Sequence, residues 1–290
     1  ANVRPVKLYP GVTHKVHGVH KQVWNPDLVD IIMIRENTEG LYHSLLRRME
    51  QRALGKKDEP IVIEEFPGLD GEVAWDPRPI SREGSESVIR FAFDYAKHRQ
   101  RKMGVSQSVT CVDKSNVTRG CQLFRKIFRE FAERNQDIAV KEAYIDAFTM
   151  WLVRNPEDLD VVVLPNMFGD IATDLASVLQ GGMGMSASAN MGPKHMLFEP
   201  VHGSSPKHAG KNVVNPIAMI QSVQMMFEAL AFRKKDQNLD KCAEILQSAI
   251  QKHFEEGGIV TYDLGGTAST SEVGQAIAMR CESMLKERFP

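Results

Sequence analysis

A run of aliphatic residues at 159–164, LDVVVL, is the feature that most constrains how this chain folds. The run is short and rich in β-branched residues, which is typical of a strand buried on both faces, as in sheets that helices cover on each side. Pro165 ends the run, the chain is expected to turn at Gly169, and the pattern of 170–179 predicts a helix. A buried strand followed by a helix indicates an α/β protein.

The rest of the chain alternates between strand and helix patterns in the same way. Strands are predicted at 29–34, 105–112 and 138–143, with a short exposed strand at 61–64, and helices at 80–97, 121–133, 215–231 and 239–256. No GxGxxG motif follows a strand and there is no P-loop, so a Rossmann nucleotide site is not expected. The glycine-rich run 181–184 follows a helix rather than opening one, and we interpret it as a turn.

Composition excludes several classes of protein. A net charge of -1 gives no reason to expect binding to nucleic acid or to an acidic membrane surface, and no apolar run is long enough to span a bilayer. The four cysteines form no CxxC pair, so neither a zinc site nor a disulfide framework is predicted. A reducing compartment inside the cell, either the cytoplasm or the mitochondrial matrix, is expected.

Two carboxylates mark the predicted helix after the buried strand. Asp170 and Asp174 are four residues apart, which places them on the same helical face. Like charges at this spacing repel each other, and a hard cation such as Mg²⁺ or Mn²⁺ would relieve the repulsion. In an isolated DxxxD pattern, Asp170 would more often cap the helix and Asp174 would be solvated. The neighbouring motifs therefore decide the interpretation.

These motifs resemble, in order along the chain, those of the metal-dependent β-decarboxylating dehydrogenases, the isocitrate and isopropylmalate dehydrogenase family. The similar segments are ANVRP at 1–5, RENTEGLY at 35–42, VDKSN at 112–116, YIDA at 144–147, LPNMFGDIATDLA at 164–176 and HGSSPKHAGKNVVNP at 202–216. The resemblance implies the two-domain α/β fold of that family, with a mixed sheet instead of a Rossmann fold. It places a small substrate, metal and dimerisation domain at 1–180, with an arm near 43–80, and the C-terminal part of a large nucleotide-binding domain at 181–290.

The resemblance also implies roles for charged residues. Arg4 and Arg35 would bind substrate carboxylates, for which the planar guanidinium fork is suited. A surface ion pair is the alternative, but Arg35 ends an apolar strand, which argues against it. Asp146, Asp170 and Asp174 would bind Mg²⁺ or Mn²⁺, and in the family the residue matching Asp146 comes from the partner subunit. A homodimer or higher oligomer with shared active sites is therefore expected.

Two further residues match the family's proton-transfer groups. Lys114 resembles the lysine that assists removal of the substrate hydroxyl proton, which acts in trans in the family dimer, and Tyr42 resembles the acid that protonates the enolate carbon. A solvated lysine and a packed tyrosine with a satisfied hydroxyl are the plain alternatives. Asn116 is expected to help place the nicotinamide or the substrate.

The segment 202–215 resembles the family's nucleotide loop, with His202 and Asn215 at the adenine and the small residues at the phosphates. Lys207 and His208 stand where NAD-using relatives tend to carry an acidic residue. A cation can pair with a 2′-phosphate but cannot accept a hydrogen bond from a ribose hydroxyl, so NADP is the expected coenzyme and NAD the alternative. If Lys207 has no role in binding, it is simply a lysine that faces the solvent. The expected coenzyme contacts are His202, Gly203, Ser204, Ser205, Lys207, His208 and Asn215.

The implied reaction is oxidative decarboxylation of a 2-hydroxy-3-carboxy acid. Asn37, Thr38 and Glu39 resemble the isocitrate, homoisocitrate and tartrate branches more than the isopropylmalate branch, and isocitrate is the expected substrate. Homoisocitrate, tartrate or malate, and isopropylmalate are alternatives, because the family residues that contact the variable part of the substrate would precede Ala1. The chain is then part of a longer enzyme, or works with a separate segment, or is a truncated or regulatory subunit without turnover. The intact Tyr42 favours catalysis.

Three histidines lie in a basic stretch between the two substrate arginines. His14, His17 and His20 follow an HxxHxxH pattern, which does not bring all three onto one face of a helix, and no helix signal surrounds them. We therefore expect a cluster of loop histidines in preference to a metal site.

Overall fold

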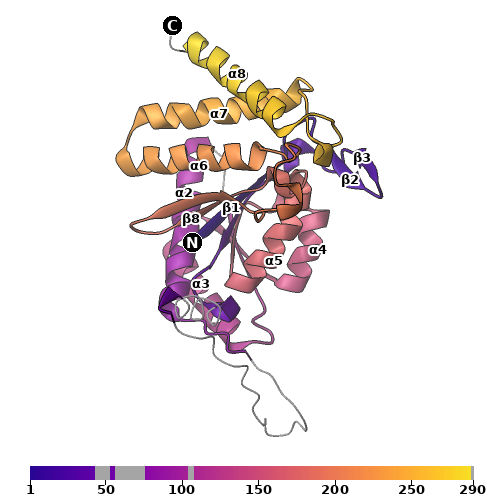
Figure 1. Ribbon diagram of the computed structural model, residues 1–290. Helices are drawn as coiled ribbons and strands as arrows, with labels where there is room; N and C mark the ends of the chain where they lie inside the picture. Colours follow the sequence, from indigo (N-terminus) through magenta and orange to yellow (C-terminus); the bar gives the residue numbers. More distant parts are fainter. Residues whose placement is uncertain (43–52, 56–75, 104–107, 289–290) are drawn as a thin grey trace.

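One mixed sheet runs through the part of the chain that the computed structural model describes, residues 1–42, 53–55, 76–103 and 108–288 (Figure 1). Its seven strands lie in the order β6-β5-β7-β4-β1-β8-β9. Their bounds are β1 (Asn2–Lys7), β4 (Asp30–Arg35), β5 (Ser108–Asp113), β6 (Ala139–Tyr144), β7 (Val161–Leu164), β8 (Ala187–Met191) and β9 (Met196–Pro200). The mixed α/β sheet expected from the sequence is confirmed.

The direction of the strands decides where functional side chains meet. Strands β6, β5, β7 and β4 are parallel, so their carboxyl ends share one edge of the sheet, whereas β1 is antiparallel to both β4 and β8. Asn2 at the start of β1 is paired with Arg35 at the end of β4, and Arg35 is paired with Leu164 at the end of β7. The first residues of the chain therefore reach the edge where open α/β sheets bind ligands.

Helices cover both faces of this sheet. Helices α2 (Arg82–Met103) and α3 (Arg119–Arg134) pack on one face, and α4 (Ile145–Arg154) and α5 (Asn166–Ser177) pack on the other. The central strand β4 is apolar on both sides, as the sequence predicted: Ile32 and Ile34 face α2 and α3, whereas Ile31 and Met33 face the opposite core. This covering by helices leaves the ends of the strands as the accessible part of the parallel sheet.

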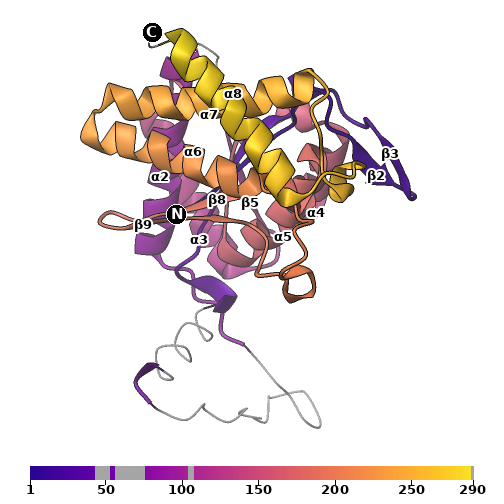
Figure 2. The same cartoon turned by 45° about the horizontal axis from the view of Figure 1, so that its top comes forward.

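The C-terminal third adds a layer of long helices. Helices α6 (Ile217–Lys234) and α7 (Gln237–Glu255) lie side by side, and α8 (Thr270–Arg288) packs against α7 (Figure 2). Among the described residues, no helix is both long and apolar enough to cross a membrane. The short 3-10 helices are η1 (Pro26–Leu28), η2 (Gly40–Tyr42), η3 (Pro156–Asp158), η4 (Val178–Gln180), η5 (Met183–Met185), η6 (Pro206–His208) and η7 (Tyr262–Leu264).

Most of the predicted elements are present with shifted ends, and the exposed strand predicted at 61–64 lies outside the described residues, as does most of the predicted arm. The turn at 181–184 is confirmed, since Gly181 and Gly182 have φ of 106° and 110°. The turn predicted at Gly169 is wrong, because α5 already begins at Asn166 and contains this glycine. The division at residue 180 stays a prediction; the sheet takes strands from both sides of it.

The histidine stretch forms a hairpin of β2 (His14–Val16) and β3 (Val19–Lys21), where we expected a loop. His14 is buried, its Nε2 lies 2.9 Å from the carbonyl oxygen of Leu179, and its Nδ1 accepts a hydrogen bond from the amide of Val23. His17 has a φ of 51° at the turn. His14 thus serves as a packing residue that attaches the hairpin to the domain.

Candidate active site

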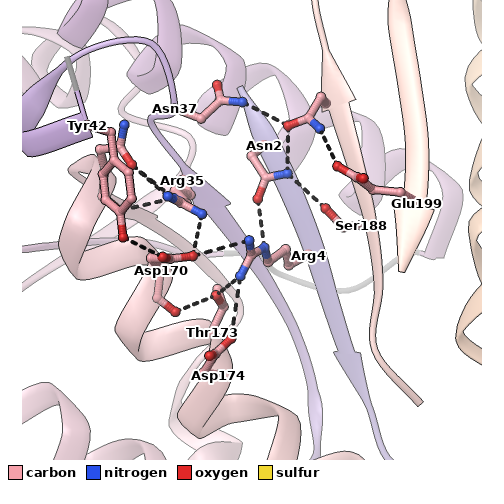
Figure 3. Close-up of polar contacts among 12 residues, drawn as sticks. Asn2, Arg4, Arg35, Asn37, Tyr42, Asp170, Thr173, Asp174, Ser188 and Glu199 are labelled. Atoms are coloured by element: carbon pink, nitrogen blue, oxygen red, sulfur yellow. Dashed lines mark hydrogen bonds and ion pairs between the residues drawn. The ribbon is translucent and has the colours of Figure 1, made fainter. Parts of the chain in front are cut away.

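Asp170 is the centre of a polar cluster at the carboxyl edge of the sheet (Figure 3). It lies on α5, and its Oδ1 accepts hydrogen bonds from Nη1 of Arg35 and, at 3.4 Å, from Nη2 of Arg4. Its Oδ2 accepts a hydrogen bond of 2.7 Å from the hydroxyl of Tyr42. Three residues that the sequence placed in separate motifs therefore converge on one carboxylate.

Arg35 is fixed by the first turn of α5 as well as by Asp170. Its Nε donates to the carbonyl oxygen of Asn166 at 3.0 Å, and its Nη2 donates to Oδ1 of the same residue at 2.8 Å. A Cβ atom at Gly169 would lie 2.6 Å from Cγ of Arg35, closer than real contacts allow. Gly169 is therefore needed for the close approach of the arginine to the helix, and not for a turn.

Arg4 joins the cluster from β1. Its Nη1 donates to the hydroxyl of Thr173 at 2.5 Å and lies 3.8 Å from Oδ1 of Asp174, and its Nε donates to Oδ1 of Asn2 at 2.8 Å. Burial, and secondly the positive charge of Arg35, lower the pKa of Arg4 from its ordinary value. Two nearly buried guanidinium groups side by side favour an anion such as a carboxylate of a substrate.

Tyr42 ends the short helix η2 at the border of the described residues. The hydrogen bond to Asp170 raises the pKa of Tyr42, and burial adds to this, while the Arg35 guanidinium, 5.2 Å from the centre of the tyrosine ring, acts in the opposite direction. The hydroxyl therefore stays protonated at neutral pH. A protonated phenol beside two arginines is suited to donate a proton to a bound anion.

Lys114 and Asp146 form a second site at the ends of β5 and β6. Nζ of Lys114 lies 2.6 Å from Oδ1 of Asp146, and this hydrogen bond is the main reason that the pKa of Asp146 is lowered. Asp146 is 66% exposed and Lys114 27% exposed. Asn116 is exposed in the turn that follows Lys114. The structure therefore places Lys114, Asn116 and Asp146 at the carboxyl edge of the sheet, where Asp146 is paired with Lys114 and not with the aspartates of α5.

The three predicted metal ligands do not form one cluster within the described residues of a single chain. Asp170 and Asp174 lie one turn apart on α5, as predicted, and both are near Arg4, whereas Asp146 is paired elsewhere. Asp174 is half-exposed, with its nearest arginine nitrogen at 3.8 Å, so its oxygens are open to a further ligand. Oxygen atoms in this arrangement fit a hard cation such as Mg²⁺ or Mn²⁺ once a third ligand arrives.

The predicted nucleotide loop, 202–215, is largely exposed and contains η6. Ser205 has a φ of 46°, and its hydroxyl lies 2.8 Å from Nδ1 of His208. The imidazole of His208 stacks on the ring of Tyr262 with centroids 6.1 Å apart. A hollow of about 320 Å³ lies here, lined by His208, Val213, Tyr262, Thr267 and Ala268. Lys207, next to His208 in the sequence, is exposed. The glycine and serine at 203–204, which precede η6, are exposed as well.

Sequence reasoning missed Tyr262, whose ring packs against His208 at the nucleotide loop. Tyr262 lies 54 positions from His208, so no local spacing connects them. Asn215, expected at the adenine, is buried and donates instead to Oδ2 of Asp263 at 3.0 Å. His202 stays in the loop, with Nδ1 at 2.9 Å from the carbonyl oxygen of Gly203.

The edge of the mixed sheet thus brings together two arginines, two aspartates on one helix face and a tyrosine hydroxyl, an arrangement suited to binding an anionic acid. The family model described as "Isocitrate/isopropylmalate dehydrogenase" matches residues 1–277, and this chain belongs to that family. It is accordingly a decarboxylating dehydrogenase acting on a CH–OH group. The resemblance seen in the sequence motifs is confirmed.

Named relatives differ in their substrates. The chain is 38% identical to the 3-isopropylmalate/3-methylmalate dehydrogenase of Methanocaldococcus jannaschii, over 97% of this chain and 73% of that protein. It is 36% identical to the homoisocitrate dehydrogenase of the same organism, over 99% of this chain and 73% of that protein. The crystal structure of isocitrate dehydrogenase from Methylococcus capsulatus has a TM-score of 0.78 at 33% identity, covering 97% of this chain and 73% of that one.

Proposed function

We propose that this protein oxidises and decarboxylates isocitrate to 2-oxoglutarate, with NADP as hydride acceptor and a divalent cation. The observation that carries the proposal is the convergence of Arg4, Arg35 and Tyr42 on Asp170. A substrate with several carboxylates would take over the guanidinium groups that Asp170 now holds. The carboxylate of Asp170 would then be available for the cation, and the tyrosine hydroxyl would face the bound acid.

The residues of this chain would divide the proton chemistry. Lys114 would take the proton of the substrate hydroxyl, while the hydride leaves the carbon that bears this hydroxyl and passes to the nicotinamide. Arg4 and Arg35 would hold the carboxylates that do not react, and so orient the carboxylate that leaves as CO₂. Tyr42 would donate its hydroxyl proton to the carbon from which CO₂ has departed. The position of its hydroxyl supports this role, because the hydroxyl already donates a hydrogen bond within the cluster of arginines and Asp170 where the acid would bind.

Asp170, Asp174 and an Asp146 from a second chain would hold the cation. Bound there, the cation would supply Lewis acidity for the hydroxyl and carbonyl oxygens of the substrate. Two features support supply of Asp146 in trans. It is 66% exposed at the end of β6, and it does not join the α5 carboxylates of its own chain.

A homodimer with shared sites follows from this proposal, and the surface beside the site supports it. Helices α4 and α5 expose large apolar side chains, which a partner subunit would cover. Trp151 is 43% exposed and Ile171 is 56% exposed. The other exposed apolar residues of this surface are Met150, Val153 and Val178.

NADP is supported by the charge and the stacking at the nucleotide loop. Lys207 is exposed next to His208, and His208 is held by Ser205 on one side and by Tyr262 on the other. A cation and an imidazole placed together offer donors to a 2′-phosphate. The motif 202–216 belongs to the same proposal, which places His202 and Asn215 near the adenine. Action inside the cell is also proposed; the four cysteines are free thiols, as a reducing compartment would keep them.

A second candidate substrate has support of its own. The relatives named for 3-isopropylmalate, 3-methylmalate and homoisocitrate are 36% to 38% identical to this chain. All of these acids carry a hydroxyl and a carboxylate on neighbouring carbons, and all fit the arginine pair. They differ in the remaining substituent, which ends in a carboxylate in isocitrate and homoisocitrate and is an isopropyl group in isopropylmalate. A further carboxylate-binding group at this substituent would therefore favour isocitrate or homoisocitrate.

The decisive experiment is a substrate panel on the whole protein with saturating Mg²⁺. It would measure kcat/KM for isocitrate, homoisocitrate, 3-isopropylmalate and malate, each with NADP and with NAD, and would record CO₂ release together with coenzyme reduction. The proposal expects the highest kcat/KM for isocitrate with NADP. A higher kcat/KM for another acid would identify that acid as the substrate in place of isocitrate. If the protein binds nucleotide but turns over none of the acids, the result would indicate a non-catalytic subunit.

A further inference from the structure

A buried ion pair lies directly behind the turn that carries Lys114. Asp113 is the last residue of β5, and its side chain has 0% exposed surface. Arg125, on the second turn of α3, donates from Nε to Oδ2 at 2.9 Å and from Nη2 to Oδ1 at 2.8 Å. Two parallel hydrogen bonds fix the orientation of both partners as well as their distance. Neither residue has a role in the chemistry proposed above.

Asp113 shapes the turn at Lys114. Besides Arg125, its Oδ1 accepts a hydrogen bond of 2.8 Å from the amide of Ser115, which is the local contact by which an aspartate holds a turn. The carbonyl oxygen of Lys114 in turn accepts hydrogen bonds of 3.0 Å from the amides of Val117 and Thr118. The backbone of Lys114 is therefore held on one side by Asp113 and on the other by the start of α3.

Arg125 extends this support to the strand that leads to Asp146. Its Nη2 also donates to the carbonyl oxygen of Ala143 at 3.0 Å, and its guanidinium lies 4.8 Å from the centre of the Tyr144 ring. Asp113 and Tyr144 are register partners at the ends of β5 and β6. One guanidinium thus joins the two strand ends, beyond which Lys114 and Asp146 meet at 2.6 Å.

We propose that Arg125 and Asp113 are positioning residues, which hold the turn of Lys114 beside Asp146 so that the amine of Lys114 reaches the reacting hydroxyl in the right geometry. The inference rests on the proposed function of Lys114. Burial by itself would lower the pKa of Arg125, but the hydrogen bond and the charge of Asp113 outweigh burial and raise this pKa overall, so the guanidinium keeps its charge. A small displacement of a proton-transfer group lowers the rate more than the affinity, since binding uses other residues.

Helix α3 offers a matched control. Arg129, one turn after Arg125, also forms a fork to a carboxylate, donating from Nε and Nη2 to the two oxygens of Glu142 at 2.7 Å each. It is 63% exposed, and it holds the middle of β6 and not the turn at Lys114. Arg125→Lys and Arg129→Lys are thus the same chemical change on the same helix. Arg125→Lys also keeps a positive charge beside the buried Asp113.

The test separates the two half-reactions of the whole enzyme with NADP and Mg²⁺. Oxidation of the hydroxy acid needs removal of the hydroxyl proton, whereas decarboxylation of the β-keto acid, supplied directly, does not. Arg125→Lys is expected to lower kcat for the hydroxy acid by about ten- to a hundredfold with KM within about threefold, and to leave decarboxylation of the β-keto acid within about twofold of wild type. Arg129→Lys is expected to match wild type in both. Equal loss of both half-reactions in Arg125→Lys would overturn the proposal, since it would indicate a general structural role.

A second readout does not depend on turnover. Brief labelling of the protein with acetic anhydride, followed by mass spectrometry of the peptide that contains Lys114, measures how accessible and how nucleophilic this amine is. Labelling of Lys114 is expected to become several-fold faster in Arg125→Lys, because the contact with Asp146 loosens, and to stay unchanged in Arg129→Lys. If Arg125→Lys does not fold, Asp113→Asn, which weakens the same fork from the other side, gives the same test. Unchanged labelling would overturn the inference, whereas absence of wild-type turnover would overturn only the proposed function.

Discussion

The hydroxyl of Tyr42 donates a hydrogen bond of 2.7 Å to Oδ2 of Asp170. The side chain proposed as proton donor is therefore attached to the carboxylate proposed as metal ligand before any substrate binds. This contact raises the pKa of Tyr42, so the proton is retained through neutral pH. It also orients the phenol towards the guanidinium groups of Arg4 and Arg35, which share the other oxygen of Asp170.

Replacing Tyr42 by Phe is expected to lower kcat by about a hundred- to ten-thousandfold, the range for loss of a positioned acid or base. The KM for the hydroxy acid should change little, because the arginines remain. Steady-state kinetics with saturating Mg²⁺ and coenzyme measure both quantities. Tyr95→Phe, on α2 and away from the site, is the control and should keep wild-type rates. A Tyr42→Phe protein with kcat near wild type would remove the tyrosine from the mechanism.

Asp170→Asn and Asp174→Asn test the metal site. Each change removes one negative charge from the oxygen ligands, so affinity for Mn²⁺ in the presence of substrate should fall at least about tenfold, which corresponds to about 1.4 kcal/mol. Asp170→Asn should also abolish decarboxylation. Calorimetric titration with Mn²⁺ measures the affinity directly. Asp158→Asn, at an exposed position in η3, is the control. Unchanged affinity and turnover in both α5 variants would show that the cation binds elsewhere.

Mixed dimers test whether sites are shared between chains. A Lys114→Met chain and an Asp170→Asn chain should each be inactive alone, because each lacks one half of every site. If the sites are shared, the mixed dimer contains one site with both defects and one intact site, so co-expression should restore part of the activity. Differently tagged chains allow the mixed species to be isolated and assayed. Isolated mixed dimers without activity would argue for sites built within single chains.

The coenzyme preference depends on the charge at the nucleotide loop. Charge-assisted hydrogen bonds to a 2′-phosphate contribute about 1.5–3 kcal/mol, or roughly ten- to a hundredfold in discrimination. We expect wild type to prefer NADP by kcat/KM, and Lys207→Asp combined with His208→Ile to shift the preference towards NAD. Lys211→Asp, on the same exposed loop, serves as the control for a change of net charge alone. A wild-type preference for NAD would leave Lys207 as a solvated surface residue.

His253 predicts how stability responds to acid. It is buried on α7, its Nε2 lies 2.8 Å from the carbonyl oxygen of Ile259, and its Nδ1 has no hydrogen-bond partner among the described residues. Burial lowers the pKa of His253, and the hydrogen bond to Ile259 offsets this only in part. The unfolded chain, with a histidine pKa of about 6.5, then takes up the proton first as pH falls. The free energy of unfolding should be highest above that pH and decrease as pH falls towards the folded pKa.

Urea unfolding at a series of pH values from about 8 to about 5 measures this decrease. His253→Gln can keep a hydrogen bond to the carbonyl oxygen of Ile259 but does not titrate, so its free energy of unfolding should fall less steeply over the same interval. His195→Gln, at an exposed position, should keep the wild-type slope. Equal slopes for His253→Gln and wild type would assign the acid sensitivity to other groups.

The sequence predicted the central parallel strands β4 and β7 well, because they are apolar on both faces and their signal is local. It predicted the site residues Arg35, Tyr42 and Asp170 as members of separate motifs, and the structure brings them into contact. Neither periodicity nor spacing could show that Arg4 would join them, because this depends on the antiparallel pairing of β1 with β4.

Other failures have a different physical reason. Gly169 looked like a turn because glycine is the usual residue where a chain reverses, but here its missing side chain makes room for Arg35. His14, His17 and His20 looked like a loop because the run of charges hid two strands of three residues each. The contact between His208 and Tyr262 joins segments far apart in sequence, and only packing of the C-terminal helices decides it.

The pairing of Arg4 opposite Met33, and of Asn2 opposite Arg35, makes substrate recognition dependent on strand alignment. Side chains alternate between the faces of a sheet, so a slip of β1 by one residue against β4 would turn Arg4 towards α2 and α3 and bring Val3 to the site. Such a protein would keep nearly all of its hydrogen bonds and yet lose one of its two anion anchors. If Arg4 binds the acid as proposed, a chain that has paired β1 incorrectly would bind the acid poorly, and the bound acid would stabilise only the correctly paired chain.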